Sequence, residues 1–61
     1  QYRRSIYVAQ DIKAGDVLNS ENLRIVRPAF GLQPKHWGEV LGKKAKLNLS
    51  KGTALKWHFF E

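Results

Sequence analysis

The side chains that most often carry enzymatic chemistry are few in this sequence and are not grouped. The histidines, His36 and His58, lie 22 residues apart, and the chain has no cysteine. A metal site needs three or four converging ligands, and acid–base catalysis needs suitably paired groups. We therefore expect neither a metal site nor a catalytic residue, and we expect both histidines at the surface or partly buried. The five acidic residues are spread along the chain at Asp11, Asp16, Glu21, Glu39 and Glu61.

Nucleophile and phosphate-binding motifs are also missing from the sequence. Ser5, Ser20 and Ser50 lack the sharp glycine-flanked turn that presents a catalytic serine. Gly42 and the two lysines after it resemble only the end of a phosphate-binding loop, because no earlier glycine has the required spacing. The sequence therefore predicts neither acyl transfer nor nucleotide hydrolysis.

The basic residues raise the possibility of a nucleic-acid surface, because single-strand binding combines a cationic groove with aromatic platforms. The aromatic residues occupy positions that a small core needs, so we interpret the lysines as a solvated or subunit-facing surface and expect no nucleic acid partner. The lysines in question are Lys43, Lys44, Lys46 and Lys51, and the aromatic residues are Tyr7, Trp37, Trp57, Phe59 and Phe60.

Length and composition indicate a single small domain that handles anionic surroundings. A chain of 61 residues buries only about 60% of its unfolded surface. The formal net charge of +6 favours anionic partners. No apolar run approaches the ~20 residues of a membrane span, and no signal-peptide pattern is present. With no cysteine as well, we expect a cytoplasmic protein without membrane contact, and a start at Gln1 without any methionine suggests a piece excised from a larger chain.

Short apolar patterns predict the elements that position these residues. Alternation and β-branched residues predict strands at residues 5–8, 23–26 and 45–49, the last with Ala45 and Leu47 facing inward. Residues 34–41 favour a helix of about two turns, with Pro34 in its first turn and Gly42 as the left-handed residue beyond it. Residues 19–21 could begin a single helical turn, because Asn19 and Ser20 are good N-cap residues.

An internal repeat relates the two halves of the chain. A shift of 37 residues places residues 11–18 on residues 48–55, and in each copy an apolar residue precedes a turn whose glycine can adopt a positive φ. The repeat predicts a pseudo-twofold, mostly β domain of short strands, although a pattern this short could also arise by chance. The coinciding pairs are Ile12/Leu49, Gly15/Gly52, Leu18/Leu55 and Leu23/Phe60.

The order of these motifs closely resembles the SAF, or antifreeze-like, domain, particularly the copy at the C-terminus of bacterial N-acetylneuraminate (sialic acid) synthases. The resemblance covers nearly the whole chain, and the motifs are specific in combination rather than singly. It implies a small β-clip fold of short strands and single helical turns, in agreement with the repeat. The motifs are Ser5-Ile6-Tyr7-Val8-Ala9, the turn of residues 11–18, Glu21-Asn22-Leu23, Arg27-Pro28, Gly31-Leu32-x-Pro34, Leu41-Gly42-Lys43 and Lys51-Gly52-Thr53-x-Leu55.

The resemblance also implies a function for the parent protein. In that family a (β/α)8 barrel, with a divalent metal (Mn or Mg), condenses phosphoenolpyruvate with N-acetylmannosamine. The antifreeze-like domain covers the active site of the opposite subunit in a domain-swapped homodimer. The 61 residues would then be one accessory domain without cofactor or catalysis, whose partners are that barrel and an N-acylmannosamine-type sugar.

The resemblance makes Arg27 the residue expected to bind substrate. In the family the arginine of an Arg-Pro-Gly motif reaches the N-acetyl group of the sugar. Here Arg27 and Pro28 match that motif, and the third position is Ala29. A guanidinium offers a planar fork of donors, and Pro28 restricts Arg27 to extended backbone. Phe30 follows in the same loop, where it could pack on the partner barrel or fold back on the core.

Two other functions are compatible with this resemblance. A SAF-type carbohydrate-binding or chaperone module of flagellar or pilus assembly would be exported, whereas a synthase domain would follow a barrel. An ice-binding protein of the antifreeze type needs a flat and largely uncharged surface, and 26% of these residues are charged. Because fold alone does not define function, we take the synthase domain as the working hypothesis.

Overall fold

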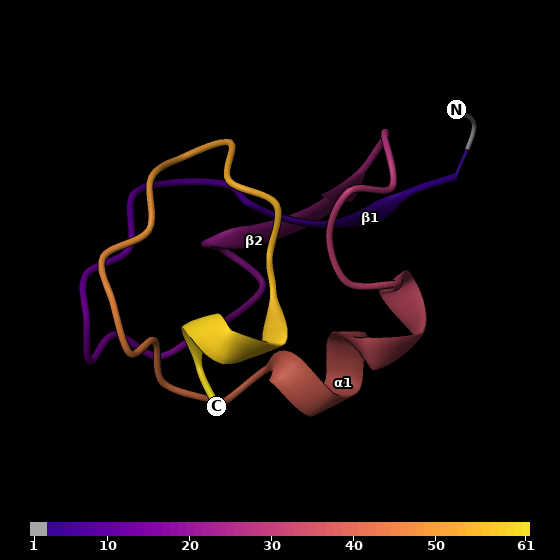
Figure 1. Cartoon of the computed structure of the whole chain (residues 1–61). Helices are drawn as coiled ribbons and strands as arrows, with labels where there is room; N and C mark the ends of the chain where they lie inside the picture. Colours follow the sequence, from indigo (N-terminus) through magenta and orange to yellow (C-terminus); the bar gives the residue numbers. More distant parts are fainter. Residues whose placement is uncertain (1–2) are drawn as a thin grey trace.

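The computed structural model describes residues 3–61, and its one regular sheet is a two-stranded antiparallel pair. β1 (Ser5–Val8) and β2 (Leu23–Val26) run side by side, with Ser5 opposite Val26 and Val8 opposite Leu23 (Figure 1). Both strands have the bounds that the alternation predicts. Their β-branched residues suit an extended backbone, and Ile6 and Val8 are almost completely buried.

The predicted helix is present but is shorter and divided. A 3-10 turn, η1 (Pro34–His36), leads into α1 (Trp37–Val40), and the backbone of Leu41 is already extended. Gly42 follows with φ +92°, as predicted for the left-handed residue after a helix. A second 3-10 turn, η2 (Trp57–Phe59), lies near the C-terminus and was not predicted. No helix in residues 3–61 is long and apolar enough to cross a membrane.

The two halves of the chain meet at Ile12 and Leu49, which are also the first pair of the sequence repeat. Each backbone N–H donates to the other residue's carbonyl, at 2.8 and 2.7 Å. Gly15 and Gly52, three residues further along each copy, have nearly the same φ, +95° and +91°. A residue with a side chain would be strained at either position, which explains why each copy has a glycine there.

Long-range backbone hydrogen bonds repeat under the same shift, with donor and acceptor halves exchanged. Four such bonds have a counterpart at the equivalent positions. For the three that join the two halves the counterpart runs in the opposite direction, which confirms the pseudo-twofold relation. The equivalent bonds are Gly15 to Ala45 (2.7 Å) and Gly52 to Val8 (2.8 Å), Leu18 to Lys43 (2.7 Å) and Leu55 to Ile6 (3.0 Å), Ala45 to Asp16 (2.9 Å) and Val8 to Thr53 (2.8 Å), and Lys46 to Phe59 (2.7 Å) and Ala9 to Asn22 (2.8 Å).

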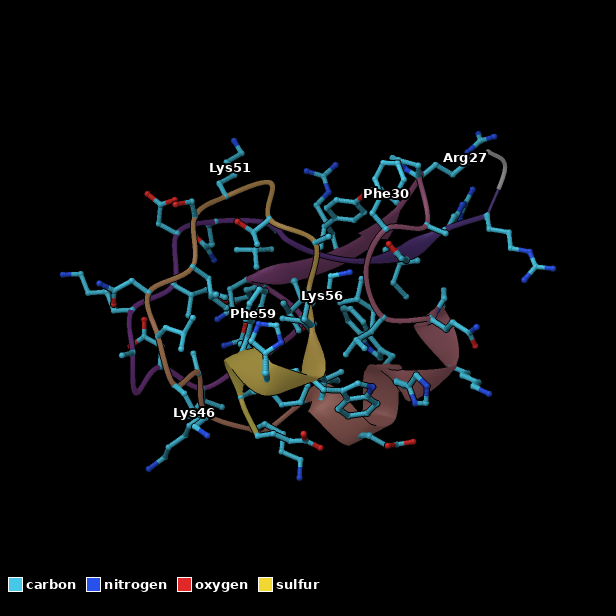
Figure 2. All side chains as sticks on the ribbon, in the orientation of Figure 1. Arg27, Phe30, Lys46, Lys51, Lys56 and Phe59 are labelled. Atoms are coloured by element: carbon cyan, nitrogen blue, oxygen red, sulfur yellow. The ribbon has the colours of Figure 1, made fainter. Side chains whose placement is uncertain are left out.

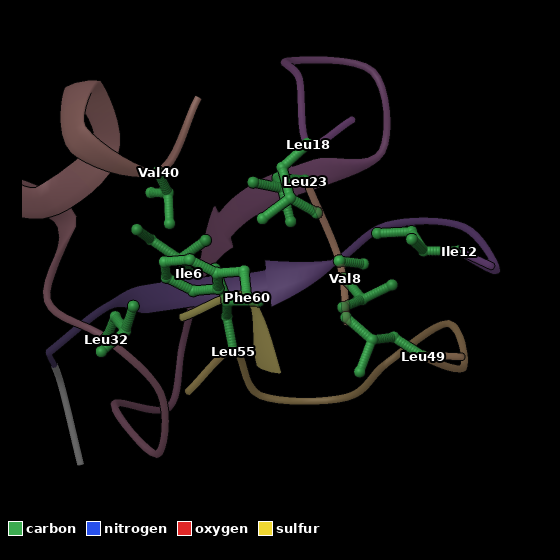
Figure 3. Close-up of a cluster of buried hydrophobic side chains, with 11 residues drawn as sticks. Ile6, Val8, Ile12, Leu18, Leu23, Leu32, Val40, Leu49, Leu55 and Phe60 are labelled. Carbon is green, nitrogen blue, oxygen red and sulfur yellow. The ribbon is translucent and has the colours of Figure 1, made fainter. Parts of the chain in front are cut away.

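A single hydrophobic core fills the space between the halves (Figure 3). The repeat predicts that Leu18 and Leu55 are buried, and both are fully buried. Leu23 and Phe60, the next equivalent pair, are 2% and 6% exposed. Val40 is the one residue of α1 that is fully buried, and it anchors the helix to this core. The core residues are Ile6, Val8, Ile12, Leu18, Leu23, Leu32, Val40, Ala45, Leu49, Leu55 and Phe60.

The predicted strand at residues 45–49 is wrong. The chain bends at Lys46 and Leu47, and only single bridges flank the bend, at Lys44 and Leu49. The reason is that successive backbone groups pair with different segments: Ala45 with Asp16, Lys46 with Phe59 and Leu49 with Ile12. The bend turns Leu47 outward, where it is 43% exposed, although Ala45 is buried as predicted.

The single helical turn suggested after Leu18 is a hydrogen-bonded turn at residues 20–22 rather than a helix. Asn19 still performs the capping chemistry, because its Oδ1 accepts the backbone N–H of Glu21 (2.8 Å) and Asn22 (3.0 Å). The chain then enters β2 directly. The buried amide of Asn22 donates to the carbonyl of Val17 at 3.0 Å, which holds the turn against the core.

Candidate functional site

The loop of residues 27–31 begins where β2 ends, and it is held by side chains of β1. The peptide bond between Arg27 and Pro28 is cis. The carbonyl of Pro28 accepts three hydrogen bonds: from the Ser5 hydroxyl at 3.1 Å, from the Tyr7 hydroxyl at 2.8 Å and from the backbone N–H of Phe30 at 3.0 Å. One carbonyl next to Arg27 is thus fixed by three donors.

Ser5 connects both ends of this loop. Its side chain is fully buried; the hydroxyl donates to Pro28 and also accepts the backbone N–H of Gly31 at 3.0 Å. A buried polar group of this kind stabilises only when it is paired, and here both the donor and the acceptor functions are used. Ser5 is therefore a structural serine, which agrees with the absence of a nucleophile motif around it.

Gly31 lies so close to the rest of the molecule that no side chain fits there. A Cβ at this position would be 2.6 Å from the carbonyl oxygen of Ile6 and 2.9 Å from the backbone nitrogen of Leu55. Both contacts are with backbone atoms, which cannot move away cheaply. The loop is thereby pressed between β1 and the C-terminal segment, and the ammonium group of Lys56 also donates to the carbonyl of Phe30.

Arg27 and Phe30 are exposed on this anchored loop, and Figure 2 shows both side chains directed away from the body of the molecule. The sequence left two positions open for Phe30, packed on a partner barrel or folded back on the core. Phe30 is 64% exposed, so it does not fold back on the core. Pro28 is half-buried. A fixed loop that presents a guanidinium and an aromatic ring can bind a ligand with little loss of conformational entropy.

A groove of about 540 Å³ lies beside the loop, and its basic residues, Arg3, Arg4 and Lys35, were not candidates at the sequence level. Its basic side chains come from the segment before β1 and from η1. Its floor includes backbone of the anchored loop. The lining includes Arg3, Arg4, Ala29, Gly31, Gln33 and Lys35.

Both histidines are placed as the sequence predicts, at the surface or partly buried. His36 is half-buried, packs edge-on against Trp57 at 5.0 Å between ring centroids and lies 3.3 Å from Glu39, while His58 is exposed. Residues 3–61 contain no group of three histidine, cysteine, aspartate or glutamate side chains that could hold a metal ion. Lys43, Lys44, Lys46 and Lys51 are exposed.

The aromatic residues do not offer the open stacking surface that single-strand binding requires. Phe60 is buried, and four others are half-buried against the domain: Tyr7, Trp37, Trp57 and Phe59. Among the described aromatic residues, only Phe30 has most of its surface exposed, and it is not near the lysine-rich segment in the chain. The exposed lysines therefore have no open aromatic platform beside them in the part of the chain that the structure describes, and their interpretation as a solvated or subunit-facing surface stays a prediction.

The anchoring residues of the loop were missed at the sequence level. The sequence placed Ser5 and Tyr7 in a strand and in a family motif. It did not indicate their hydrogen bonds to Pro28, because Pro28 lies more than 20 positions away in the chain. Gly31 belongs to one of the motifs that resemble the family, but the local sequence does not show that its backbone lies against Ile6 and Leu55. Arg3, Arg4 and Lys35 gave no signal, as they come together only in the folded chain.

These observations define a small, basic and pseudo-symmetric β domain with one anchored, exposed loop. The chain belongs to the SAF domain family, whose model matches residues 3–61. This confirms the resemblance that the order of the motifs indicates.

Relatives of this chain are synthases of sugar acids. It is 49% identical over 55 residues to a pseudaminic acid synthase of Campylobacter jejuni subsp. jejuni serotype O:23/36 (strain 81-176), which covers 90% of this chain and 16% of the relative. The pseudaminic acid synthase of C. jejuni serotype O:2 is 47% identical over 60 residues, 98% of this chain and 18% of the relative. The N,N'-diacetyllegionaminic acid synthase of Legionella pneumophila is 36% identical over 59 residues, 97% of this chain and 17% of the relative. The chain thus spans less than a fifth of the length of these relatives.

Proposed function

We propose that this chain is the accessory domain of a nonulosonic acid synthase, similar to the pseudaminic and legionaminic acid types, and that it contributes substrate contacts rather than catalysis. In this proposal the catalytic centre lies in a (β/α)8 barrel elsewhere in the parent protein, which uses phosphoenolpyruvate and a divalent metal. The domain covers the active site of the opposite subunit in a homodimer. The similarity to pseudaminic and legionaminic acid synthases supports this assignment.

The observation that carries the proposal is the anchored loop of residues 27–31. Three donors fix the Pro28 carbonyl, and Gly31 is pressed against Ile6 and Leu55, while Arg27 stays exposed. In the proposed complex the Arg27 guanidinium donates to the carbonyl oxygen of an N-acyl group on the sugar. Phe30 contacts the barrel or the sugar ring through its exposed face.

The test uses the full-length synthase that carries this domain. Arg27→Ala should lower kcat/KM for the acyl-amino sugar by about 30-fold to 100-fold, which corresponds to the loss of one charge-assisted hydrogen bond of ~2–3 kcal/mol. Arg27→Lys should recover part of this loss, because an ammonium keeps the charge but not the planar fork. KM for phosphoenolpyruvate should change little.

Arg24→Ala is the matched control, because Arg24 is an exposed arginine on β2 of the same domain. This variant should keep kcat/KM within about twofold of the wild type, since exposed charges outside a site contribute little. Near-normal kinetics of Arg27→Ala, or equal losses in both variants, would refute the assigned role of Arg27.

A further inference from the structure

The groove next to the anchored loop differs in charge from a second hollow, of similar size, in the described part of this domain. That other hollow, of about 530 Å³, is lined by Glu39, Glu61, Lys43 and Trp57, so its charges are of both signs. The groove beside the loop is lined by three cationic side chains, Arg3, Arg4 and Lys35, and by no acidic residue. The positive charge of the groove beside the loop is therefore not balanced by an acidic side chain in its lining.

We infer that the groove formed by Arg3, Arg4 and Lys35 is a binding site for a small multivalent anion of the carboxylate or phosphate type. Two guanidinium groups can each offer a planar fork of donors to such a group, and an ammonium adds a compact charge. Gln33 supplies an uncharged amide that can donate to the same ligand.

One part of the groove lining, at Gly31, is held in place by the fold. Gly31 lines the groove, and its position is fixed by the Ser5 hydroxyl and by close contact with Ile6 and Leu55. A volume of about 540 Å³ lies within the range of small-molecule sites, roughly 300–1,000 Å³. Because this part of the lining is already ordered, it lowers the ordering cost of binding.

The net charge of the chain supports the same ligand class. The formal charge is +6, and the acidic side chains at Asp11, Asp16, Glu21, Glu39 and Glu61 are absent from the groove. Concave surfaces lined by one sign of charge focus the electric potential and concentrate counter-ions. This site does not involve Arg27, so the inference is independent of the proposed role of that residue.

The test is a titration of the ¹⁵N-labelled chain with inorganic phosphate and with citrate at constant ionic strength. We expect saturable amide shifts centred on Ala29, Gly31, Gln33 and Lys35, with a Kd on the order of 1 mM. Shifts distributed evenly over all lysines, or no saturation up to about 100 mM, would overturn the inference, because the anions would then only screen the surface.

Paired variants separate the groove from general charge effects. The double variant Arg4→Gln with Lys35→Gln removes both charges but keeps part of each aliphatic stem. It should weaken citrate binding about fivefold or more, given ~0.5–1 kcal/mol for each exposed charge pair. Lys13→Gln with Lys51→Gln removes the same charge from two exposed turns and should change the Kd by less than twofold. Equal weakening in both double variants would contradict a localised site.

A carboxylate ligand of the groove could be a small molecule or an acidic segment of another protein. Binding of an acidic peptide distinguishes these two ligands. A hexaglutamate peptide should bind no more tightly than citrate at equal ionic strength if the groove is a compact anion site. Binding about tenfold tighter than citrate would show that the surface docks an acidic protein segment and would overturn the small-anion site. Arg4→Ala with Lys35→Ala provides a second variant pair should the glutamine side chains find new partners in the groove.

Discussion

The repeated turns at residues 11–18 and 48–55 and the single loop at residues 27–31 are stabilised by different kinds of contact. The two turns are held by backbone–backbone hydrogen bonds that exchange under a shift of 37 residues. The loop is held mainly by side-chain donors, from Ser5, Tyr7 and Lys56. Backbone hydrogen bonds therefore form the same turn in both halves of the chain, whereas the side-chain hydrogen bonds hold a loop that is described in one half only.

The positions equivalent to the loop anchors show how this difference arises. Under the repeat, Ser5 corresponds to Gly42 and Tyr7 corresponds to Lys44. Gly42 ends the helical segment with φ +92°, and Lys44 is exposed, so neither supplies the hydroxyl that holds Pro28. The bridges that Tyr7 and Lys44 make, to Ala54 and Val17, are nevertheless equivalent. Two hydroxyl side chains of β1 thus hold Pro28, and the equivalent positions of the other half carry no hydroxyl.

The largest expected effects test the equivalence of the two halves. Leu18→Ala and Leu55→Ala should each lower the free energy of unfolding by about 3 kcal/mol, because both leucines are fully buried and truncation leaves a cavity. The two losses should agree within about 1 kcal/mol, as measured by urea denaturation. Leu18→Val and Leu55→Val, each costing roughly 1 kcal/mol for one lost methylene, keep the comparison measurable if the alanine variants do not fold. A large loss at one position and a negligible loss at the other would contradict the equivalence.

A smaller effect tests how tightly the loop is held. Gly31→Ala should lower the free energy of unfolding by about 2–3 kcal/mol, because the added Cβ meets backbone atoms of Ile6 and Leu55. In a domain of this size that corresponds to a fall in Tm of roughly 10 °C or more, measurable by circular dichroism.

Gly38→Ala is the control for this substitution. Gly38 lies in α1, and a Cβ there would have no atom within 4 Å. Alanine is the better helix former, so this variant should gain about 0.5–1 kcal/mol. If Gly31→Ala proves as stable as Gly38→Ala, the loop is not pressed against β1 as described.

Sequence patterns were sufficient for the part of the fold that depends on backbone pairing. Alternation located both strands, and the repeat located Gly15 and Gly52 and the buried Leu18 and Leu55, because each of these features depends on neighbours at short or regular spacing. The same alternation failed at Leu47. There, the backbone groups of the adjacent residues Ala45 and Lys46 pair with two different segments, at Asp16 and Phe59, and that competition cannot be seen in a local window.

The candidate site was predicted only in part, for a related reason. The resemblance to the family pointed to Arg27 and Pro28, which match its Arg-Pro-Gly motif, and to Phe30 in the same loop. The roles of these three residues in binding stay predictions. The exposure of Phe30 and the anchoring by Ser5 and Tyr7 depend on contacts more than 20 residues apart in the chain. The groove depends on Arg4, just before β1, and Lys35, in η1, lining the same hollow, which no spacing rule describes.

The smallest expected effect concerns a pair of side-chain hydrogen bonds that the repeat relates to each other. The carboxylate of Asp11 accepts the backbone N–H of Lys51 at 2.8 Å, and the amide oxygen of Asn48 accepts that of Ala14 at 2.9 Å. Asp11 and Asn48 are equivalent under the shift, so each half caps the turn of the other. Asn48→Ala should lower the free energy of unfolding by about 0.5–1 kcal/mol, and Asp11→Ala by about 1–1.5 kcal/mol, because a charged acceptor makes the stronger hydrogen bond.

Asp11→Asn makes the two caps chemically the same and separates geometry from charge. If the backbone framework is symmetric, this variant should lose only a few tenths of a kcal/mol, and the excess cost of Asp11→Ala over Asn48→Ala should shrink as salt is added, because exposed charges are screened. Urea denaturation at low and high sodium chloride measures both effects. A cost for Asp11→Asn equal to that of Asp11→Ala would mean that the amide cannot replace the carboxylate, and the two turns would then share a backbone but not a capping geometry.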